Sequence, residues 1–319
     1  MFLANNKKVR IMRISRAVIR RIVLATSLLT GWFLTSSAFA QDYVLDPNWP
    51  QPLPDGIEWG QVPNVTIDQE GFIYAFHRAE PPVLKFNPAG ELVDTFGSEW
   101  VTTPHGFRAA PDGTLWATDY NPQNGHTVTQ FNTDGRVLLR FGARGFRGVG
   151  PNTFDGPADS AVAANGDIFV ADGHWNNRIV KFSKEGRYLM EWGGKGAGPG
   201  QFDLPHTIVI DRRGRVFVGD RSNHRIQIFD QEGTYITEWD QFGWPSGMFI
   251  DQNDVLYVAD YQSKRGVTYG SAEDGTVMGF IEGSEPEGVV VDADGNVYTG
   301  EVTGGEGGEG RIMRKFIKQ

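Results

Sequence analysis

The chain has 319 residues with 41 glycines and no cysteine, and its formal net charge is −9 at pH 7. The lack of cysteine excludes disulfides and thiolate metal sites, so any metal must be held by histidine, carboxylate or carbonyl groups. The negative charge argues against nucleic acid or an anionic membrane surface as a partner.

The first forty residues have the pattern of a secretory signal peptide. Seven Lys and Arg residues between Lys7 and Arg21 precede an apolar run from Ile22 to about Phe33, and Ala38-Phe39-Ala40 is a small-x-small cleavage pattern. The apolar run is shorter than the roughly 20 residues that a bilayer-spanning helix needs. We therefore expect residues 1–40 to be removed by cleavage after Ala40, and the mature protein to be periplasmic or secreted with no membrane span. Loss of seven cations leaves it a charge of about −16.

Residues 41–319 are organised by an internal repeat. Residues 157–182 show the unit best: an alternating strand, an Asn165-Gly166 turn, a second strand that ends in Asp172 and a third that ends at Phe182. Each unit begins with an anchor proline, and successive prolines are 41, 53, 48, 40 and 41 residues apart. The anchors are Pro63, Pro104, Pro157, Pro205, Pro245 and Pro286.

Six units of this length predict a single all-β domain, a six-bladed β-propeller, over residues 41–319. The two-residue turns between strands favour antiparallel neighbours within each blade. Because the chain ends near the third strand of the sixth unit, we expect a strand from residues 57–61 to complete that blade and close the ring.

The residue after each anchor proline lies at one rim of such a propeller, together with the residues that follow each second strand. After the prolines the sequence reads Asn64, His105, Ala158, His206, Ser246 and Glu287. His105, His206 and Glu287 come from alternate blades, about 120° apart, and would converge on the central axis. Two imidazoles and one carboxylate suit a divalent transition metal. The alternative is that all three are ordinary polar rim residues bonded to backbone or water.

Other residues at this rim fall into two groups. Asp172 with Arg178, and Asp220 with Arg225, recur between blades and are interpreted as local structural pairs, with His224 in the same structural motif. Arg78 and His174 break the repeat and are therefore candidates for function. Arg78 could bind a substrate carboxylate and His174 could transfer a proton, with Tyr120 at the same rim as a further substrate contact.

These motifs resemble those of the peptidyl-α-hydroxyglycine α-amidating lyases, which are six-bladed propellers of the NHL type, from about Val62 to Phe316. Leu204-Pro205-His206 and Pro104-His105-Gly106 look like two of the family's three zinc-binding histidine motifs. Phe76-His77-Arg78 looks like its motif for the substrate carboxylate, and residues 172–178 are similar to the segment with its catalytic tyrosine. This chain departs from the family in having His174 at the tyrosine position and Glu287 at the third histidine.

The resemblance implies a metal-dependent C–N lyase that releases glyoxylate, with His105, His206 and Glu287 on zinc, or on iron or manganese, Arg78 on the substrate carboxylate and His174 as the base. The family's structural calcium uses backbone groups at positions that match Val65 and Phe107. Its aspartate corresponds to Gly288 here, so the resemblance does not extend to a complete calcium site.

Two other functions fit the same fold, because fold does not imply function. One is a non-catalytic NHL propeller that binds a peptide, protein or glycan on its rim. The other is a hydrolase like gluconolactonase, although that class resembles Glu, Asn and Asp ligation and the rim here is rich in histidine. We expect a small-molecule or peptide substrate, or a protein partner on the rim, and a monomeric protein.

Overall fold

The computed structural model describes residues 42–303 and 312–319, and the named strands in this part of the chain form six four-stranded antiparallel sheets. The predicted signal peptide and its cleavage site after Ala40 lie outside the described residues. The helical structure within them is one 3₁₀ turn, η1 (Arg221–Asn223). No described helix is long and apolar enough to cross a membrane.

Each sheet is one blade. The first blade is β2 (Asn64–Ile67), β3 (Ile73–Phe76), β4 (Val83–Phe86) and β5 (Leu92–Phe96), and the second is β6 (Pro104–Ala109), β7 (Leu115–Asp119), β8 (Thr127–Phe131) and β9 (Val137–Phe141). The third is β10 (Pro157–Val162), β11 (Ile168–Asp172), β12 (Arg178–Phe182) and β13 (Tyr188–Gly193), and the fourth is β14 (Pro205–Ile210), β15 (Val216–Asp220), β16 (Arg225–Phe229) and β17 (Tyr235–Trp239). The fifth is β18 (Gly247–Ile250), β19 (Val255–Asp260), β20 (Gly266–Ser271) and β21 (Val277–Ile281), and the sixth is β22 (Pro286–Val291), β23 (Val297–Glu301), β24 (Met313–Lys318) and β1 (Tyr43–Leu45).

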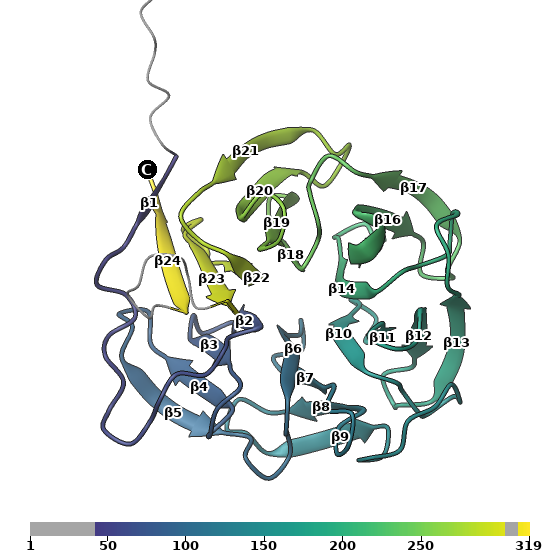
Figure 1. The fold of residues 1–319 in the computed structure, drawn as a ribbon, viewed down its shortest axis with the longest axis horizontal. Coiled ribbons are helices and arrows are strands. Elements are labelled where there is room, and N and C mark those ends of the chain that lie inside the picture. Colours follow the sequence, from purple (N-terminus) through teal and green to yellow (C-terminus); the bar gives the residue numbers. More distant parts are fainter. Residues whose placement is uncertain (1–41, 304–311) are drawn as a thin grey trace, which may run out of the picture. The chain divides into compact units, whose positions relative to one another are not determined.

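The blades stand around a central axis (Figure 1), and the innermost strands β2, β6, β10, β14, β18 and β22 each contact the next one, with β22 contacting β2. Neighbouring blades pack through large apolar side chains, such as Phe141 of the second blade on Phe182 of the third, with ring centroids 4.3 Å apart. This packing puts the apolar core between blades and leaves the ends of the innermost strands for polar side chains. The all-β, six-bladed propeller predicted from the repeat is confirmed.

The strand that closes the ring is not the one expected. Instead of residues 57–61, β1 pairs with β24 and completes the sixth blade. Residues 57–61 cover the first blade, where Trp59 stacks on Phe86 with ring centroids 5.8 Å apart. Gly60 lies so close to the backbone of Arg78 that a Cβ atom would be 2.5 Å from its carbonyl. This close approach fixes the segment against the first blade, so a strand earlier in the chain closes the ring.

The turns between the first and second strands define the face opposite the anchor prolines. In the sixth blade, Oδ1 of Asp292 accepts hydrogen bonds from the backbone N–H groups of Asp294 (3.0 Å) and Asn296 (2.8 Å). Gly295 in this turn has φ +86°, a conformation that favours glycine.

Candidate functional site

The side chains that follow the anchor prolines are turned toward the axis by β-bulges. On β14, Pro205 pairs with Asp220 and Thr207 pairs with Gly219, so His206 has no partner on the neighbouring strand. The same register shift occurs at His105 in β6 and at Glu287 in β22. A bulge re-aims a side chain at the end of a strand. The three predicted metal ligands therefore meet at one end of the axis.

His105 and His206 are held in matching orientations by backbone carbonyls. Nδ1 of His105 lies 2.7 Å from the carbonyl of Ala158, and Nδ1 of His206 lies 2.7 Å from the carbonyl of Ser246. A carbonyl only accepts, so each Nδ1 carries the proton and each Nε2 keeps its lone pair. Metal-binding histidines are typically oriented by this kind of hydrogen bond. Burial, together with neighbouring positive and imidazole groups, holds the pKa of both side chains well below 6.5.

Glu287 places a carboxylate between these two imidazoles. Its Oε1 lies 3.5 Å from Nε2 of His105 and 3.4 Å from Nε2 of His206, and the residue is 5% exposed. Burial raises the pKa of Glu287, and the positive charges of Arg221 and Arg78 oppose that shift. This buried carboxylate therefore lies beside two neutral imidazoles and the guanidinium of Arg221, whose Nη1 is 3.8 Å from Oε1.

His174 joins the same cluster from the loop after β11. Its Nε2 lies 2.9 Å from Nε2 of His105, where His174 must donate because the proton of His105 is on Nδ1. This leaves Nδ1 of His174 as an acceptor. Gly173 before it has no room for a side chain, since a Cβ atom would lie 1.9 Å from the carbonyl oxygen of Pro205. Burial, followed by Arg221 and Arg78, lowers the pKa of His174 to about 3.

Arg78 and Tyr120 form one wall of the site. The guanidinium of Arg78 lies 5.3 Å from the ring centroid of Tyr120 and donates to the Pro104 carbonyl (3.2 Å) and to Gln61 (2.8 Å). The Tyr120 ring stacks on His174 and meets the ring of His105 edge-on, with centroids 4.5 and 5.0 Å apart. The residues assigned to substrate, base and metal from the sequence are thus brought together.

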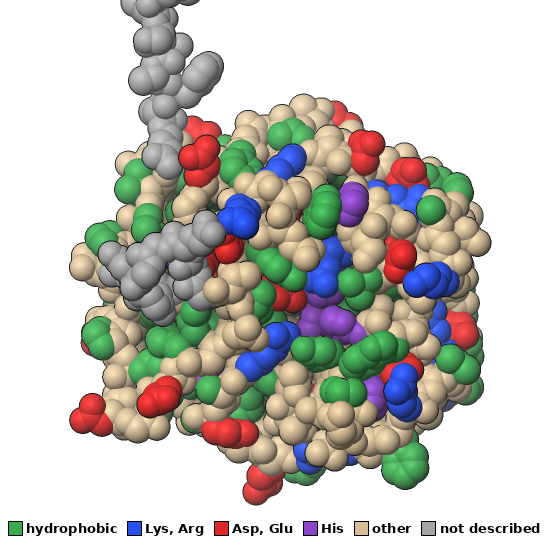
Figure 2. Space-filling model, viewed as in Figure 1, with side chains coloured by type: hydrophobic (Ala, Val, Ile, Leu, Met, Phe, Trp, Pro, Cys, Tyr) green, Lys and Arg blue, Asp and Glu red, His purple; other side chains and the backbone are tan. Residues whose placement is uncertain are grey.

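Arg221 also belongs to the site, although its role was not predicted from the sequence. Its Nη1 donates to Nε2 of His206 at 2.9 Å and lies 3.8 Å from Oε1 of Glu287. The signal was present, because the position after the second strand holds tyrosine in the second and fifth blades and arginine in the fourth. Figure 2 shows the histidine side chains at the centre of this face, with basic and acidic side chains beside them.

The donor set fits a divalent metal. Ligand nitrogens of His105, His174 and His206 lie within 4.8 Å of one another, and the carboxylate of Glu287 adjoins two of them. Backbone carbonyls hold the Nδ1 protons of His105 and His206, and the Nε2 atom of each ring lies within 3.5 Å of Oε1 of Glu287. Nitrogen and oxygen donors of this kind suit zinc, iron or manganese.

The positions that match the family's calcium site lie among buried residues of this chain. Val65 and Phe107 are fully buried, and Phe107 stacks on Phe76 with ring centroids 4.7 Å apart. At Gly288 a Cβ atom would lie 2.7 Å from Cα of Asn64. The position of the calcium-binding aspartate therefore has no room for a side chain.

The recurring aspartates at the rim make the local pairs predicted for them. Asp172 bonds Arg178 at 3.0 Å and Asp220 bonds Arg225 at 2.9 Å. His224 stacks on Trp244, with centroids 3.9 Å apart, and is exposed at the end of η1. These contacts give structural roles to the repeated residues and leave the axial cluster as the candidate site.

Comparison with known proteins identifies the repeat and several relatives of this chain. The model of a family described as NHL repeat matches residues 154–182 and 202–229. Peptidyl-alpha-hydroxyglycine alpha-amidating lyase 1 of Drosophila melanogaster is 30% identical over 179 residues, which are 47% of this chain and 32% of that protein. NHL repeat-containing protein 3 of Homo sapiens is 32% identical over 161 residues, 47% of this chain and 45% of that protein. The matches therefore span less than half of these relatives.

Solved structures support the fold. A gluconolactonase of Xanthomonas campestris has a TM-score of 0.62 and 14% identity, covering 82% of this chain and 87% of that one. A streptogramin B lyase has a TM-score of 0.59 and 12% identity, covering 87% and 98%. The chain thus contains NHL repeats, folds as a six-bladed propeller and has homologues named peptidyl-alpha-hydroxyglycine alpha-amidating lyase.

Proposed function

We propose that this protein is an exported, metal-dependent lyase that cleaves the C–N bond of a peptidyl-α-hydroxyglycine and releases glyoxylate. The support is the joint presence, in one cluster, of two carbonyl-oriented imidazoles, a buried carboxylate and two arginines, in a chain whose relatives include enzymes named for this activity. The single observation that carries the proposal is the convergence of the lone pairs of His105 and His206 beside Glu287.

His105, His206 and Glu287 would hold the metal. When bound, a divalent metal supplies Lewis acidity toward a hydroxyl or carboxylate oxygen of the substrate. The protein contributes orientation, since the carbonyls of Ala158 and Ser246 fix the tautomer of each histidine.

Arg78 and Arg221 would bind the substrate carboxylate. Both guanidinium groups face a cluster whose imidazoles are neutral, so the site attracts an anion once the charge of Glu287 is balanced. A guanidinium matches the two oxygens of a carboxylate with parallel N–H donors. This contact would orient the α-carbon and leave its hydroxyl group toward the histidines.

His174 would act on the hydroxyl proton. A neutral imidazole always keeps one nitrogen as an acceptor, and the low pKa of the His174 side chain keeps it neutral at pH 7. As the proton moves to His174, the O–H electron pair forms the carbonyl of glyoxylate and the C–N bond breaks. The amide nitrogen then takes a proton, which His174 can return, so the products are a peptide amide and glyoxylate with the base regenerated.

The test is glyoxylate release by the purified mature protein after loading with zinc, iron(II) or manganese(II), with metal content measured in parallel. We expect about one metal per chain and turnover of a peptidyl-α-hydroxyglycine. The combined His105→Ala and His206→Ala variant should lose the metal and retain its fold. Metal-loaded wild-type protein that releases no glyoxylate would contradict the lyase assignment.

A binding role is the second candidate, because one relative is named only for its NHL repeats. In that case the histidines and Glu287 would be polar rim groups. The protein would then bind no metal and would not turn over the substrate. The same metal and glyoxylate measurements decide between the two roles.

Export is part of the proposal and is supported by the cationic start, the short apolar run and Ala38-Phe39-Ala40. We expect N-terminal sequencing to show that the mature protein begins at Gln41. A chain that starts near Met1 in a cytosolic fraction would contradict it.

A further inference from the structure

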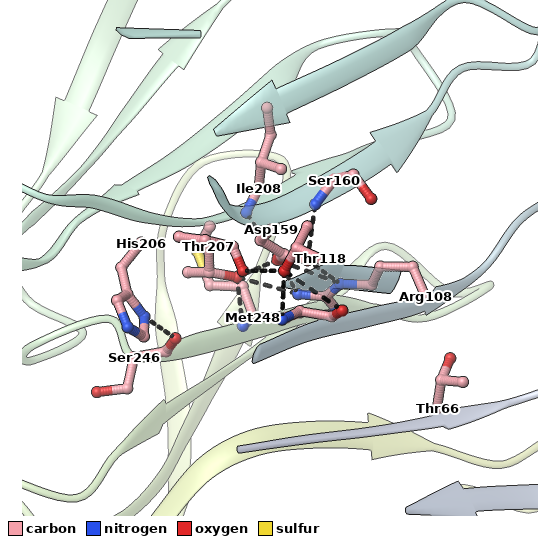
Figure 3. Close-up of polar contacts among 12 residues, drawn as sticks. Thr66, Arg108, Thr118, Asp159, Ser160, His206, Thr207, Ile208, Ser246 and Met248 are labelled. Carbon is pink, nitrogen blue, oxygen red and sulfur yellow. Dashed lines mark hydrogen bonds and ion pairs between the residues drawn. The ribbon is translucent and has the colours of Figure 1, made fainter. Parts of the chain in front are cut away.

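A buried ion pair lies on the axis, next to the metal-site cluster on its turn-face side. Arg108 of β6 meets Asp159 of β10 in a bidentate contact, with Nε 3.1 and 3.2 Å from the two carboxylate oxygens and Nη2 2.5 Å from Oδ2. Figure 3 shows this contact at the centre of a network of polar groups. The side chains of Arg108 and Asp159 are 11% and 2% exposed.

This pair connects the innermost strands of four blades. Oδ2 of Asp159 accepts from the hydroxyl of Thr207 (3.0 Å) and the backbone N–H of Ile208 (3.1 Å), both on β14. Nη1 of Arg108 donates to the carbonyl of Met248 on β18 at 2.7 Å. One guanidinium and one carboxylate thus bridge β6, β10, β14 and β18.

The bridged atoms adjoin the carbonyls that orient the two histidines. Ala158, which accepts from Nδ1 of His105, directly precedes Asp159. Ser246, which accepts from Nδ1 of His206, is two residues before Met248. The carbonyl of Ala158 also accepts from the hydroxyl of Thr118 at 2.9 Å, which further restricts its position.

Arg108 also borders a cavity on the turn-face side of the site. Arg108 lines a cavity of about 230 Å³ together with Thr66, Ser160 and Ile208, all of which lie further along the innermost strands than the residues of the site. The described lining of this cavity contains neither histidine nor Glu287. Arg108 therefore borders this cavity, whose described lining includes none of the proposed metal ligands.

We propose that Arg108 and Asp159 are positioning residues, which hold the carbonyls of Ala158 and Ser246 at the spacing that directs His105 and His206 to one metal. This rests on the proposed metal site. The strands β6, β10, β14 and β18 belong to four separate sheets, and no backbone hydrogen bond joins any two of these described strands, so their relative positions depend on side chains. A bidentate ion pair fixes distance and angle together, which apolar packing does not.

The test compares Asp159→Asn with a matched control, Asp211→Asn. Asp211 also pairs with an arginine, at 2.7 Å from Arg215, and its side chain is 1% exposed, but it lies at the turn end of β14. Affinities for zinc and cobalt(II) are measured by competition with a chromogenic chelator at a temperature where all variants are folded. We expect Asp159→Asn to weaken metal binding roughly 10–100-fold, as for other changes around metal ligands, and Asp211→Asn to leave it unchanged.

A second variant separates positioning from stability. Combined Arg108→Met and Asp159→Leu replaces the pair by apolar side chains of similar volume, an exchange that can restore stability. We expect its melting temperature to recover toward that of the wild type while the metal affinity stays weak. Recovery of both quantities, or wild-type affinity in Asp159→Asn, would overturn the proposal.

Ring ¹⁵N spectra of the histidines give a readout that needs no metal. In the wild type, His105 and His206 should each show a single Nδ1–H tautomer, and Asp159→Asn should give a tautomer mixture for both. If wild-type protein binds no metal, the proposed function fails, and these spectra alone decide the positioning role. Unchanged tautomers in Asp159→Asn would then overturn it.

Discussion

Three histidines share one site, yet their surroundings differ at the scale of single atoms. His105 and His206 each donate Nδ1–H to a carbonyl, which suits a ligand with a fixed orientation. His174 instead donates through Nε2 to another imidazole, and its Nδ1 is an acceptor. In the proposed mechanism the same residue type would therefore fill two roles, ligand and proton acceptor, and the hydrogen bonds of the rings are the observed difference between them.

His174→Ala tests the second role. Since a positioned base typically contributes 10²-fold or more, we expect glyoxylate release to fall by roughly that factor while metal content stays constant. His224→Ala is the matched control, because this exposed histidine stacks on Trp244 at a distance from the axis, and its turnover should equal that of the wild type. Loss of the metal in His174→Ala would assign the residue to the ligands instead.

Arg78→Ala tests the carboxylate contact. Removing a charged hydrogen-bond donor costs about 1.5–3 kcal/mol, so we expect KM to rise roughly tenfold or more with a smaller change in kcat. Arg78→Lys keeps the charge and loses the fork of donors, and its KM should lie between the two. Wild-type KM in Arg78→Ala would show that the carboxylate is held elsewhere, with Arg221 as the next residue to change.

At the scale of strands, the site depends on bulges and the ring depends on β1. Tyr43 of β1 is 3% exposed and its ring meets that of Tyr269 edge-on, with centroids 5.6 Å apart, whereas Val44 beside it is 46% exposed. We expect Tyr43→Ala to lower the free energy of unfolding by about 3 kcal/mol, since a large side chain is removed from the core. Val44→Ala is the control, with a change of about 0.5 kcal/mol or less. Equal urea unfolding curves for both variants would contradict a closing role for β1.

Periodic features of the strands could be predicted from the sequence, and single departures from the period could not. The six prolines gave the number of blades, and the residues after them gave the axial position of His105, His206 and Glu287. The prediction of the closing strand was wrong because β1, with only three residues from Tyr43 to Leu45, is too short to be distinguished from a loop in the sequence. No sequence pattern predicted the contact between Arg108 and Asp159 either, since the two residues lie 51 positions apart and in different blades.

At the scale of the whole molecule, the buried imidazoles link folding to pH. The pKa of His105 and His206 in the folded protein lies well below 6.5, and that of His174 is about 3. As the pH falls below 6.5, the unfolded chain therefore takes up protons that the folded chain does not. Each such histidine lowers the free energy of unfolding by about 1.4 kcal/mol per pH unit. Glu287, whose pKa is raised, acts in the opposite direction, because the folded chain binds its proton first.

The contribution of the histidines is isolated by comparing wild-type protein with the combined His105→Asn and His206→Asn variant, both freed of metal with a chelator. Urea unfolding between pH 7 and pH 5 should show a wild-type free energy that falls with decreasing pH, and a shallower fall in the variant. The difference in slope should approach twice the value for one histidine, because two of the neutral imidazoles have been removed while Glu287 remains in both proteins. Metal added to the wild type should steepen its curve, since protons compete with the metal for the same nitrogens. Parallel curves for the two metal-free proteins would mean that these imidazoles take up protons in the folded chain as they do in the unfolded chain, which would contradict their lowered pKa.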